Sequence, residues 1–322
     1  MRHDNAVVVG GGVSGLTSAL CLAEAGVNVR VWAAEPPEQT TSMVAGALWG
    51  PSFQEPVERT LAWTRQSLDD FRDLAGRPAT GVRMASGLTV GQLPPADRLP
   101  PQAQMIPDLR ACPADELPGG YPAGFTGTMP LIDMPIYLRY LTDRLIAAGG
   151  VLETRRVSSL TEAAEAAPIV VNCSGLGARE LAGDTALRPV FGQVVVLTNP
   201  GLREIFLELS AGPEFTHLVP HADRVLCGGV SKPDVWDRTP DPDVSRSIVD
   251  RCRRIEPRLH DAEIVDVVTG LRPDRPAVRV EATTIGTARC VHNYGHSGSG
   301  VSLSWGCARD TARLALGGQC SS

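Results

Sequence analysis

The chain has 322 residues, of which 43% are hydrophobic and 20% charged, and its mean hydropathy is -0.02. This composition is typical of a globular protein, and the length is enough for a large core and for two domains. The formal net charge of -6 argues against a nucleic-acid surface. No run of about 18 apolar residues indicates a membrane span.

The eight cysteines stand singly, without a C-x-x-C pair, which argues against a zinc site and against a disulfide framework. They are typical of small core residues in a reducing compartment. The first residues pass directly into an apolar, strand-like run, with no secretory h-region before it. We therefore expect a cytoplasmic protein.

The clearest pattern lies at the N-terminus. AVVV (6–9) predicts a short buried strand, GGGVSG (10–15) a tight turn, and residues 16–25 a helix that ends at Gly26. Residues 27–32 alternate apolar and polar side chains, which predicts a second strand. Together these elements form a βαβ unit.

The rest of the chain mixes helices and strands. Residues 81–130 are rich in Pro and Gly and predict loops and short strands. Helical spacing of apolar residues predicts an amphipathic helix over 132–150. A second helix with Asp in its first turn is expected over 241–255. Apolar runs predict further strands, several joined by hairpins, within 168–178, 191–201, 216–230 and 288–295. This order of elements favours a mixed α/β architecture.

Gly10, Gly12 and Gly15 form a G-x-G-x-x-G motif between the first strand and its helix. The first glycine permits the turn, the second lets the backbone approach a pyrophosphate, and the third packs the helix on the strand. The alternative is a glycine turn that serves packing alone. Glu35 is the candidate ribose-binding acid, although alanines directly follow the strand. The motif does not distinguish NAD from FAD.

A second glycine-rich stretch, HNYGHSGSGVSLSWG (292–306), runs directly into a predicted helix. Free backbone N–H groups and the positive end of the helix dipole suit the negative charge of a reduced flavin. A second backbone cradle far along the chain suits a long cofactor such as FAD. A buried turn without function is the alternative reading.

The chain resembles the D-amino-acid oxidase family of glutathione-reductase-2-like flavoproteins nearly from end to end. The segments that carry this resemblance are VVVGGGVSGLTSAL, TTSMVAGALWGP, PLIDMPIYLRYL, VVNCSGLGARELAGD, LRPVFGQVVVL, GLRPDRPAVRVE and VHNYGHSGSGVSLSWGCA. The resemblance implies a discontinuous FAD-binding domain of Rossmann type (1–50, 131–185 and 268–322). A mixed-sheet substrate domain would comprise residues 51–130 and 186–267.

The resemblance also implies the chemistry. In this family an amino acid gives its α-hydrogen to flavin N5 as a hydride, and the imine product hydrolyses to a 2-oxo acid and ammonia. O2 then reoxidises the flavin and forms hydrogen peroxide. No acid–base residue is needed when the amine is neutral, so catalysis is chiefly alignment. The expected partners are therefore an amino-acid-like small molecule and O2.

Site residues follow by matching motifs. Arg272 in GLRPDRP matches the arginine that clamps the substrate carboxylate, a bidentate charge-assisted pair. The alternative is that Arg272 pairs with a nearby acid such as Asp274. Gly298 matches the glycine whose carbonyl accepts the substrate amine. The expected cofactor-binding residues are Gly10, Gly12, Val13, Ser14, Gly15, Glu35, Thr40, Thr41, Ser42, Ala45, Gly46, Ser174, Gly175, Gly298, Ser299, Gly300, Val301 and Ser302.

Three positions depart from the family. Two tyrosines that face small substrates in family members are replaced by His217 and Pro213, and a tyrosine of the flavin loop is replaced by Ser299. These changes predict a substrate other than a standard small D-amino acid. His217 is a candidate donor to the substrate carboxylate or side chain, the alternative being a solvated lid histidine. A metal site with His221 is not expected, because a strand separates the two histidines by roughly 13 Å.

Other functions stay open on the sequence. A glycine- or sarcosine-oxidase-like enzyme for secondary amines is the nearest rival, and a catalytically inactive flavin-binding module is a second. An NAD-dependent dehydrogenase is disfavoured by the C-terminal glycine loop. The oligomeric state is also open, with a homodimer among the options.

Overall fold

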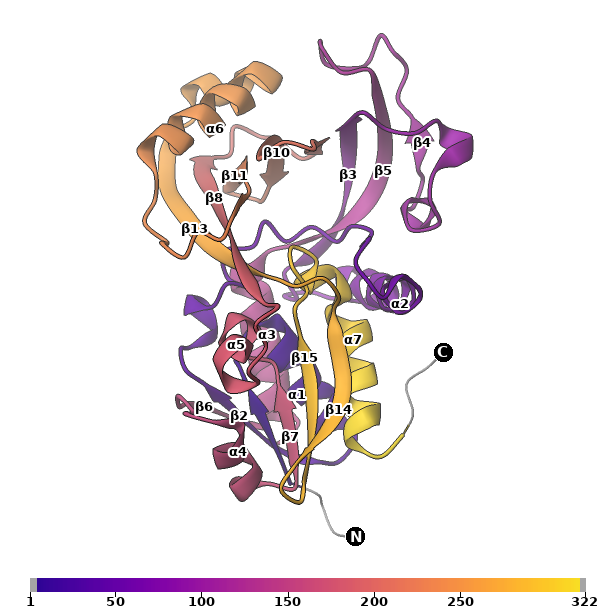
Figure 1. The fold of residues 1–322 in the computed structure, drawn as a ribbon. Helices are drawn as coiled ribbons and strands as arrows, with labels where there is room; N and C mark the ends of the chain where they lie inside the picture. Colours follow the sequence, from indigo (N-terminus) through magenta and orange to yellow (C-terminus); the bar gives the residue numbers. More distant parts are fainter. Residues whose placement is uncertain (1–4, 319–322) are drawn as a thin grey trace.

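A computed structural model describes residues 5–318, which form two sheets with helices packed against each (Figure 1). The helices are α1 (Val13–Glu24), α2 (Val57–Ala75), α3 (Met134–Ala147), α4 (Leu160–Ala166), α5 (Ala178–Leu181), α6 (Pro242–Ile255) and α7 (Gly300–Ala315). Short 3-10 turns occupy Pro37–Gln39, Ala96–Arg98, Ala103–Met105, Gly175–Gly177 and Pro257–Asp261.

The first sheet has six strands in the order β14-β15-β7-β1-β2-β6. All neighbouring pairs run parallel except β14 with β15. The predicted βαβ unit is confirmed, since β1 pairs with β2 in parallel and α1 connects them. The bounds are β1 (Asn5–Val9), β2 (Asn28–Ala33), β6 (Val151–Thr154), β7 (Ile169–Asn172), β14 (Arg279–Ile285) and β15 (Ala288–Tyr294).

Helices cover both faces of this sheet. Ala6 and Val8 of β1 belong to one apolar cluster with α1, α3 and α7, whereas Val7 and Val9 belong to another with α4. Successive strand side chains point to opposite faces, so a central strand covered on both faces must be apolar throughout. The run AVVV meets that requirement.

The second sheet has nine strands, in the order β12-β8-β11-β10-β9-β3-β5-β4, with β13 paired to β8 off this path. Helix α6 packs on it and shares an apolar cluster with β8 and β11. Its strands are β3 (Val82–Gly91), β4 (Arg110–Ala111), β5 (Ala123–Ile132), β8 (Arg188–Thr198), β9 (Ile205–Leu209), β10 (Glu214–Pro220), β11 (Arg224–Val230), β12 (Lys232–Pro233) and β13 (Ile264–Asp274).

The sequence predicted some of these elements and missed others. The two helices predicted over 132–150 and 241–255 appear as α3 and α6, and the hairpin within 216–230 appears as β10 and β11. The region 81–130 holds two paired strands of 10 residues, β3 and β5, which are longer than expected. Glycines interrupt both strands and hide the alternation that marks a strand.

Two elements cross the expected division into domains. Helix α2 follows residue 51 but packs against α7 beside the six-stranded sheet. Strand β13 extends past residue 268 as far as Asp274 and belongs to the nine-stranded sheet. One of the links between the sheets thus lies directly after Asp274, two residues beyond Arg272, where the chain leaves β13 for β14 (Figure 1).

Candidate functional site

A cavity of about 870 Å³ lies at the carboxyl ends of β1, β2 and β7. Its walls come from both sheets, because residues of the first βα turn and of the loop before α7 line it together with residues of β8, β10 and β13. Open α/β sheets bind ligands at this edge, and the volume lies within the usual range for cofactor sites.

The first glycine turn lets two strand ends approach closely. Gly10 has a φ of 117°, and a Cβ added there would lie 2.3 Å from the carbonyl oxygen of Cys173. A Cβ at Gly15 would lie 1.9 Å from the carbonyl oxygen of Gly10. Gly10 therefore shapes the floor of the cavity, while Gly15 packs α1 on β1.

Two helices begin at the cavity, α1 at Val13 and α7 at Gly300. Neither has an acidic residue in its first turn, and neither N-cap residue caps its helix with a side chain. At α1 the hydroxyl of Ser42 accepts a hydrogen bond of 3.0 Å from the backbone N–H of Val13. Their positive ends therefore stay available for negative groups of a ligand. A pyrophosphate at α1 and an anionic flavin edge at α7 fit this pair of helix ends, so the residues present suit FAD.

Most of the expected cofactor residues line the cavity together. They are Gly10, Gly12, Val13, Ser14, Glu35, Thr40, Thr41, Ser42, Ala45, Gly46, Ser174, Gly175, Gly298, Gly300 and Val301. Gly15, Ser299 and Ser302 do not line it. The hydroxyl of Ser302 instead accepts a hydrogen bond of 3.1 Å from the backbone N–H of Gly50, and so joins α7 to the segment before α2.

Arg272 reaches the cavity from β13, where it lies opposite Val190 of β8. Its Nη1 lies 3.4 Å from the carbonyl oxygens of both Phe191 and Val230, and burial lowers the pKa of its guanidinium. Within residues 5–318, no carboxylate forms an ion pair with it. Asp274 pairs with Arg188 at 2.9 Å instead, so the alternative partner for Arg272 is excluded.

His217 lines the same cavity from β10. Its Nε2 is shielded from solvent and has no hydrogen-bond partner among the described residues. Burial, reinforced by the charges of Arg272 and Arg251, lowers the pKa of the imidazole to about 4. His217 is therefore a neutral, half-buried group whose Nε2 is shielded, and not a solvated lid histidine.

The other two altered positions lie away from the cavity wall. Pro213 is exposed before β10, and Ser299 is the N-cap residue of α7. His221 does not line the cavity either, and its Nδ1 lies 3.5 Å from a carboxylate oxygen of Asp133. The two histidines of the H-x-x-x-H pattern thus have separate surroundings.

Several lining residues escaped the sequence analysis. Arg155 and Arg156 directly follow β6, and Arg155 lies 3.8 Å from the ring centre of Trp32. The sequence feature that could have identified them is a pair of arginines directly after a strand, because parallel strands end at the ligand-binding edge of the sheet. Near His217, the apolar side chains of Leu48, Leu207 and Val219 line the cavity. These could not be found without the fold, because they come from three separate segments.

The charge of the cavity is uneven. The cationic side chains that line it, among the described residues, are Arg272 on the nine-stranded sheet and the Arg155–Arg156 pair beyond the outer strand β6. A single cation, Arg272, therefore lies at the apolar end of the cavity near Leu207.

No helix within residues 5–318 is both long enough and apolar enough to cross a membrane.

Comparisons with known proteins agree with this geometry. Residues 5–314 match the family described as FAD dependent oxidoreductase. The chain is 46% identical to a D-amino-acid oxidase of Rubrobacter xylanophilus over 311 residues, which cover 96% of this chain and 95% of that protein. It is 48% identical to a D-amino-acid oxidase of Streptomyces coelicolor over 317 residues, which cover 98% and 97%.

Among solved structures, glycine oxidase from Geobacillus kaustophilus has the same fold. The TM-score is 0.79 at 18% identity, with 99% of this chain and 96% of that chain covered. The family match spans nearly the whole chain, and the identities to two oxidases are high over the same length. The chain belongs to the FAD-dependent oxidoreductase family.

Proposed function

We propose that this protein is an FAD-dependent D-amino-acid oxidase. The observation that carries the proposal is Arg272, a half-buried guanidinium that faces the cavity and forms no ion pair with a carboxylate of residues 5–318. A buried cation without a partner is costly, so a carboxylate ligand supplies what the site lacks. Two relatives with 46% and 48% identity over nearly the full chain carry this name.

FAD, when bound, would accept the α-hydrogen of the amino acid together with two electrons, and it would pass the electrons to O2 to give hydrogen peroxide. The amino acid would be left as an imine, which water converts to a 2-oxo acid and ammonia. The protein aligns the substrate. Arg272 binds the α-carboxylate with two parallel hydrogen bonds. The carbonyl of Gly298 accepts a hydrogen bond from the amine. Gly298 is close to the clamp, since a Cβ added there would lie 3.7 Å from Cδ of Arg272.

His217 is the second donor to the carboxylate in this proposal. A neutral imidazole carries one N–H, and the Nε2 of His217 has no protein partner in the described chain. His217 would thereby take over the hydrogen bond that a tyrosine makes in other family members. Because the imidazole is neutral, it adds a hydrogen bond without adding a charge.

The cavity favours neutral, bulky D-amino acids. Arg272 is occupied by the α-carboxylate, and no second cation lines the wall formed by Leu48, Leu207 and Val219 among the described residues. A side-chain carboxylate would therefore be buried without a partner, which costs several kcal/mol. Each additional buried methylene contributes about 0.8 kcal/mol. We therefore expect D-phenylalanine and D-leucine to exceed D-alanine, and D-alanine to exceed D-aspartate.

The test is anaerobic bleaching of the flavin absorbance by a panel of amino acids. The panel contains the four D-amino acids, their L-enantiomers, glycine and sarcosine. The proposal expects reduction by neutral D-amino acids and little by the rest. Preference for sarcosine would favour the secondary-amine alternative, and no reduction by any member would favour a flavin-binding module.

The variant Arg272→Ala tests whether Arg272 binds the substrate carboxylate. Truncating one partner of a buried charge pair costs about 2–5 kcal/mol, so kcat/KM for the best D-amino acid is expected to fall accordingly. Arg272→Lys is the matched variant, because it keeps the charge and loses the bidentate geometry, and it should recover only part of the loss. Turnover of Arg272→Ala at the native rate would refute the assignment.

Four further properties belong to the proposal: the electron acceptor, the location, the assembly and the division into domains. The physiological acceptor is O2, which an oxygen electrode tests. The location is the cytoplasm, in keeping with seven free cysteines in the described chain. The assembly is a homodimer, which light scattering after size exclusion tests. The cofactor domain comprises the six-stranded sheet with its helices, and the substrate domain comprises the nine-stranded sheet.

A further inference from the structure

Arg272 and Gly298 reach the substrate end of the cavity from different elements. Arg272 is the third-last residue of β13, and Gly298 lies in the loop between β15 and α7. Two hydrogen bonds join these segments directly. The backbone N–H of Ser297 donates to the carbonyl of Pro273 at 3.0 Å, and its hydroxyl donates to Asp274 at 2.7 Å. The two groups are therefore aligned by contacts between a strap (273–279) and a loop (295–298).

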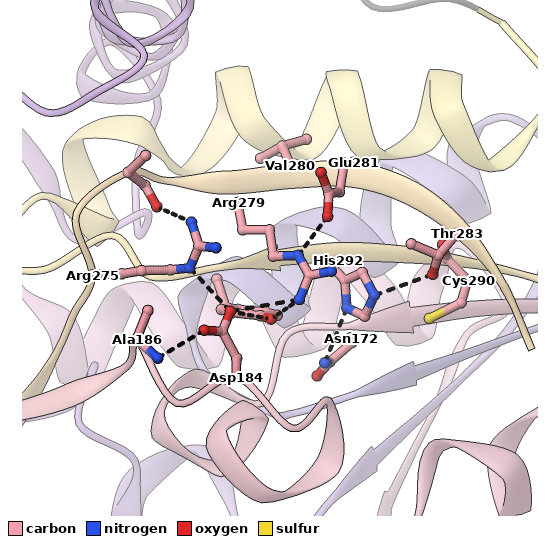
Figure 2. Close-up of polar contacts among 12 residues, drawn as sticks. Asn172, Asp184, Ala186, Arg275, Arg279, Val280, Glu281, Thr283, Cys290 and His292 are labelled. Carbon is pink, nitrogen blue, oxygen red and sulfur yellow. Dashed lines mark hydrogen bonds and ion pairs between the residues drawn. The ribbon is translucent and has the colours of Figure 1, made fainter.

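Asp184 lies behind this strap and loop, at the centre of a polar network (Figure 2). Its Oδ2 accepts hydrogen bonds from Nε of Arg275 at 3.0 Å and from the hydroxyl of Tyr294 at 2.8 Å. Nη1 of Arg279 lies 3.5 Å from the same oxygen and also donates to the Tyr294 hydroxyl. The Oδ1 atom accepts the backbone N–H of Ala186 at 3.2 Å. One carboxylate thus connects the strap, the end of β15 and its own segment.

The network is buried enough to matter energetically. The side chain of Asp184 is 7% exposed, and those of Arg275 and Arg279 are 23% and 20% exposed. Burial alone would raise the pKa of Asp184, but the hydrogen bonds from Tyr294 and Arg275 outweigh burial and hold its pKa below the ordinary value. Asp184 is therefore anionic, so the hydrogen bonds that it accepts are charge-assisted and stronger than neutral ones. Removing its charge leaves Arg275 without an ion-pair partner among the described residues, whereas Arg279 keeps Glu281 at 2.6 Å.

Arg275 connects Asp184 to the loop (295–298) that carries Gly298. Its side chain crosses Gly295, where an added Cβ would lie 2.8 Å from Cδ of Arg275, and Gly295 has a φ of 80°. The guanidinium of Arg275 is held by Asp184 at one end and by the carbonyl of Ala277 at 2.7 Å. The strap is thereby pressed against the loop three residues after Arg272 and three residues before Gly298.

We propose that Asp184 is a positioning residue, which sets the distance between the Arg272 guanidinium and the Gly298 carbonyl so that one substrate meets both. This inference rests on the proposed function. It differs from a role in stability alone, because it concerns the relative placement of a carboxylate site and an amine site. A misplacement of about 1 Å is enough to cost a large factor in rate.

Asp184→Asn tests this role, because the amide keeps the shape of the side chain and loses its charge. Two ligands are compared on the FAD-loaded protein: a D-amino acid, which needs both Arg272 and Gly298, and the carboxylic acid of the same carbon skeleton without the amine, which needs Arg272 alone. We expect the rate of flavin reduction by the D-amino acid to fall at least about tenfold. The Kd of the amine-free acid, measured from the flavin spectrum, should change much less.

Asp184→Glu restores the charge and should recover part of the reduction rate. Asp70→Asn is the control, because it removes the charge of another partly buried acid, which forms an ion pair with Arg309 of α7. That variant should lose thermal stability only. Equal weakening of both ligands by Asp184→Asn, or a native reduction rate, would overturn the positioning role.

Ser297→Ala covers the case in which Asp184→Asn does not fold. It removes the 2.7 Å hydrogen bond to Asp274 from the same interface and leaves the network around Asp184 in place. The same split between the two ligands is expected, in a weaker form, and its absence would count against the proposal. Failure of the native protein to be reduced by any D-amino acid would instead contradict the proposed function, since carboxylate binding is measured independently of turnover.

Discussion

At the scale of single residues, Arg272 and His217, which are proposed to bind the substrate carboxylate, each lie against a glycine. A neighbour with a Cβ would leave no room for either side chain. A Cβ at Gly192 would lie 2.6 Å from Nη1 and Nη2 of Arg272, and a Cβ at Gly228 would lie 2.0 Å from Cε1 of His217. Both glycines lie in strands that pair with the strand bearing the functional side chain. The room for the clamp is thus made by the absence of a side chain at these two neighbouring positions.

Gly192→Ala should weaken substrate binding without unfolding the protein. The atoms that clash are at the far end of the Arg272 side chain, so the guanidinium moves and the backbone does not. We expect KM for the best D-amino acid to rise about tenfold, which corresponds to about 1.4 kcal/mol, with unchanged FAD content. Steady-state kinetics test this, and Gly212→Ala, whose added Cβ meets only atoms 3.4 Å or farther away, is the control.

At the scale of elements, the site depends on two helices packed against each other. Helices α1 and α7 both begin at the cavity, and α7 is held on its other side by α2. Helices α2 and α7 approach closely at Gly306, where an added Cβ would lie 2.3 Å from the Cα of Trp63. The indole of Trp63 donates to Asp310 of α7 at 2.9 Å, so the two helices also share a buried polar contact.

Gly306→Ala should therefore separate α2 from α7. The clash is with backbone, which cannot yield as a side chain does, and overpacking of this kind costs about 1–3 kcal/mol or more. Urea unfolding followed by circular dichroism measures the change in the free energy of unfolding. Gly76→Ala at the end of α2 is the matched control, since its Cβ meets only Asp73 at 3.5 Å. Equal stability of both variants would contradict this account of the packing.

At the scale of the whole molecule, buried histidines link stability to pH. Burial lowers the pKa of His217, His221, His292 and His296 to about 4 in the folded protein, against about 6.5 in the unfolded chain. Between these values the unfolded chain binds more protons, so stability rises with pH. His292 shows the structural reason, because its ring nitrogens already contact Asn172 and Thr283 at 3.3 and 3.2 Å (Figure 2).

The free energy of unfolding should therefore fall as the pH falls from about 6.5 towards about 4, by up to about 1.4 kcal/mol per pH unit for each such histidine. Urea unfolding at pH 7 and pH 5.5 measures this slope above the range in which ordinary carboxylates titrate. His292→Gln removes one titrating group and should flatten the slope. A stability that is the same at both pH values would show that these histidines bind protons equally in both states.

The limits of the sequence are visible at particular residues. The first βαβ unit, its glycine turn and Glu35 were predictable, because they depend on neighbours a few residues apart. The family resemblance located Arg272 and Gly298, and the structure brings both to one cavity. Helix α2 and the strand β13 that carries Arg272 were missed, since their packing partners lie far along the chain.

The sequence by itself determined the class of fold, the cofactor-binding turn and the family, since these are written in local spacing and in motifs. Only the tertiary structure decided that Arg272 is free of Asp274, that His217 is neutral and half-buried, and that Asp184 holds the strap beside them. These properties depend on which residues meet across two sheets. Burial and charge arise from contacts between residues distant in sequence, and no local pattern records them.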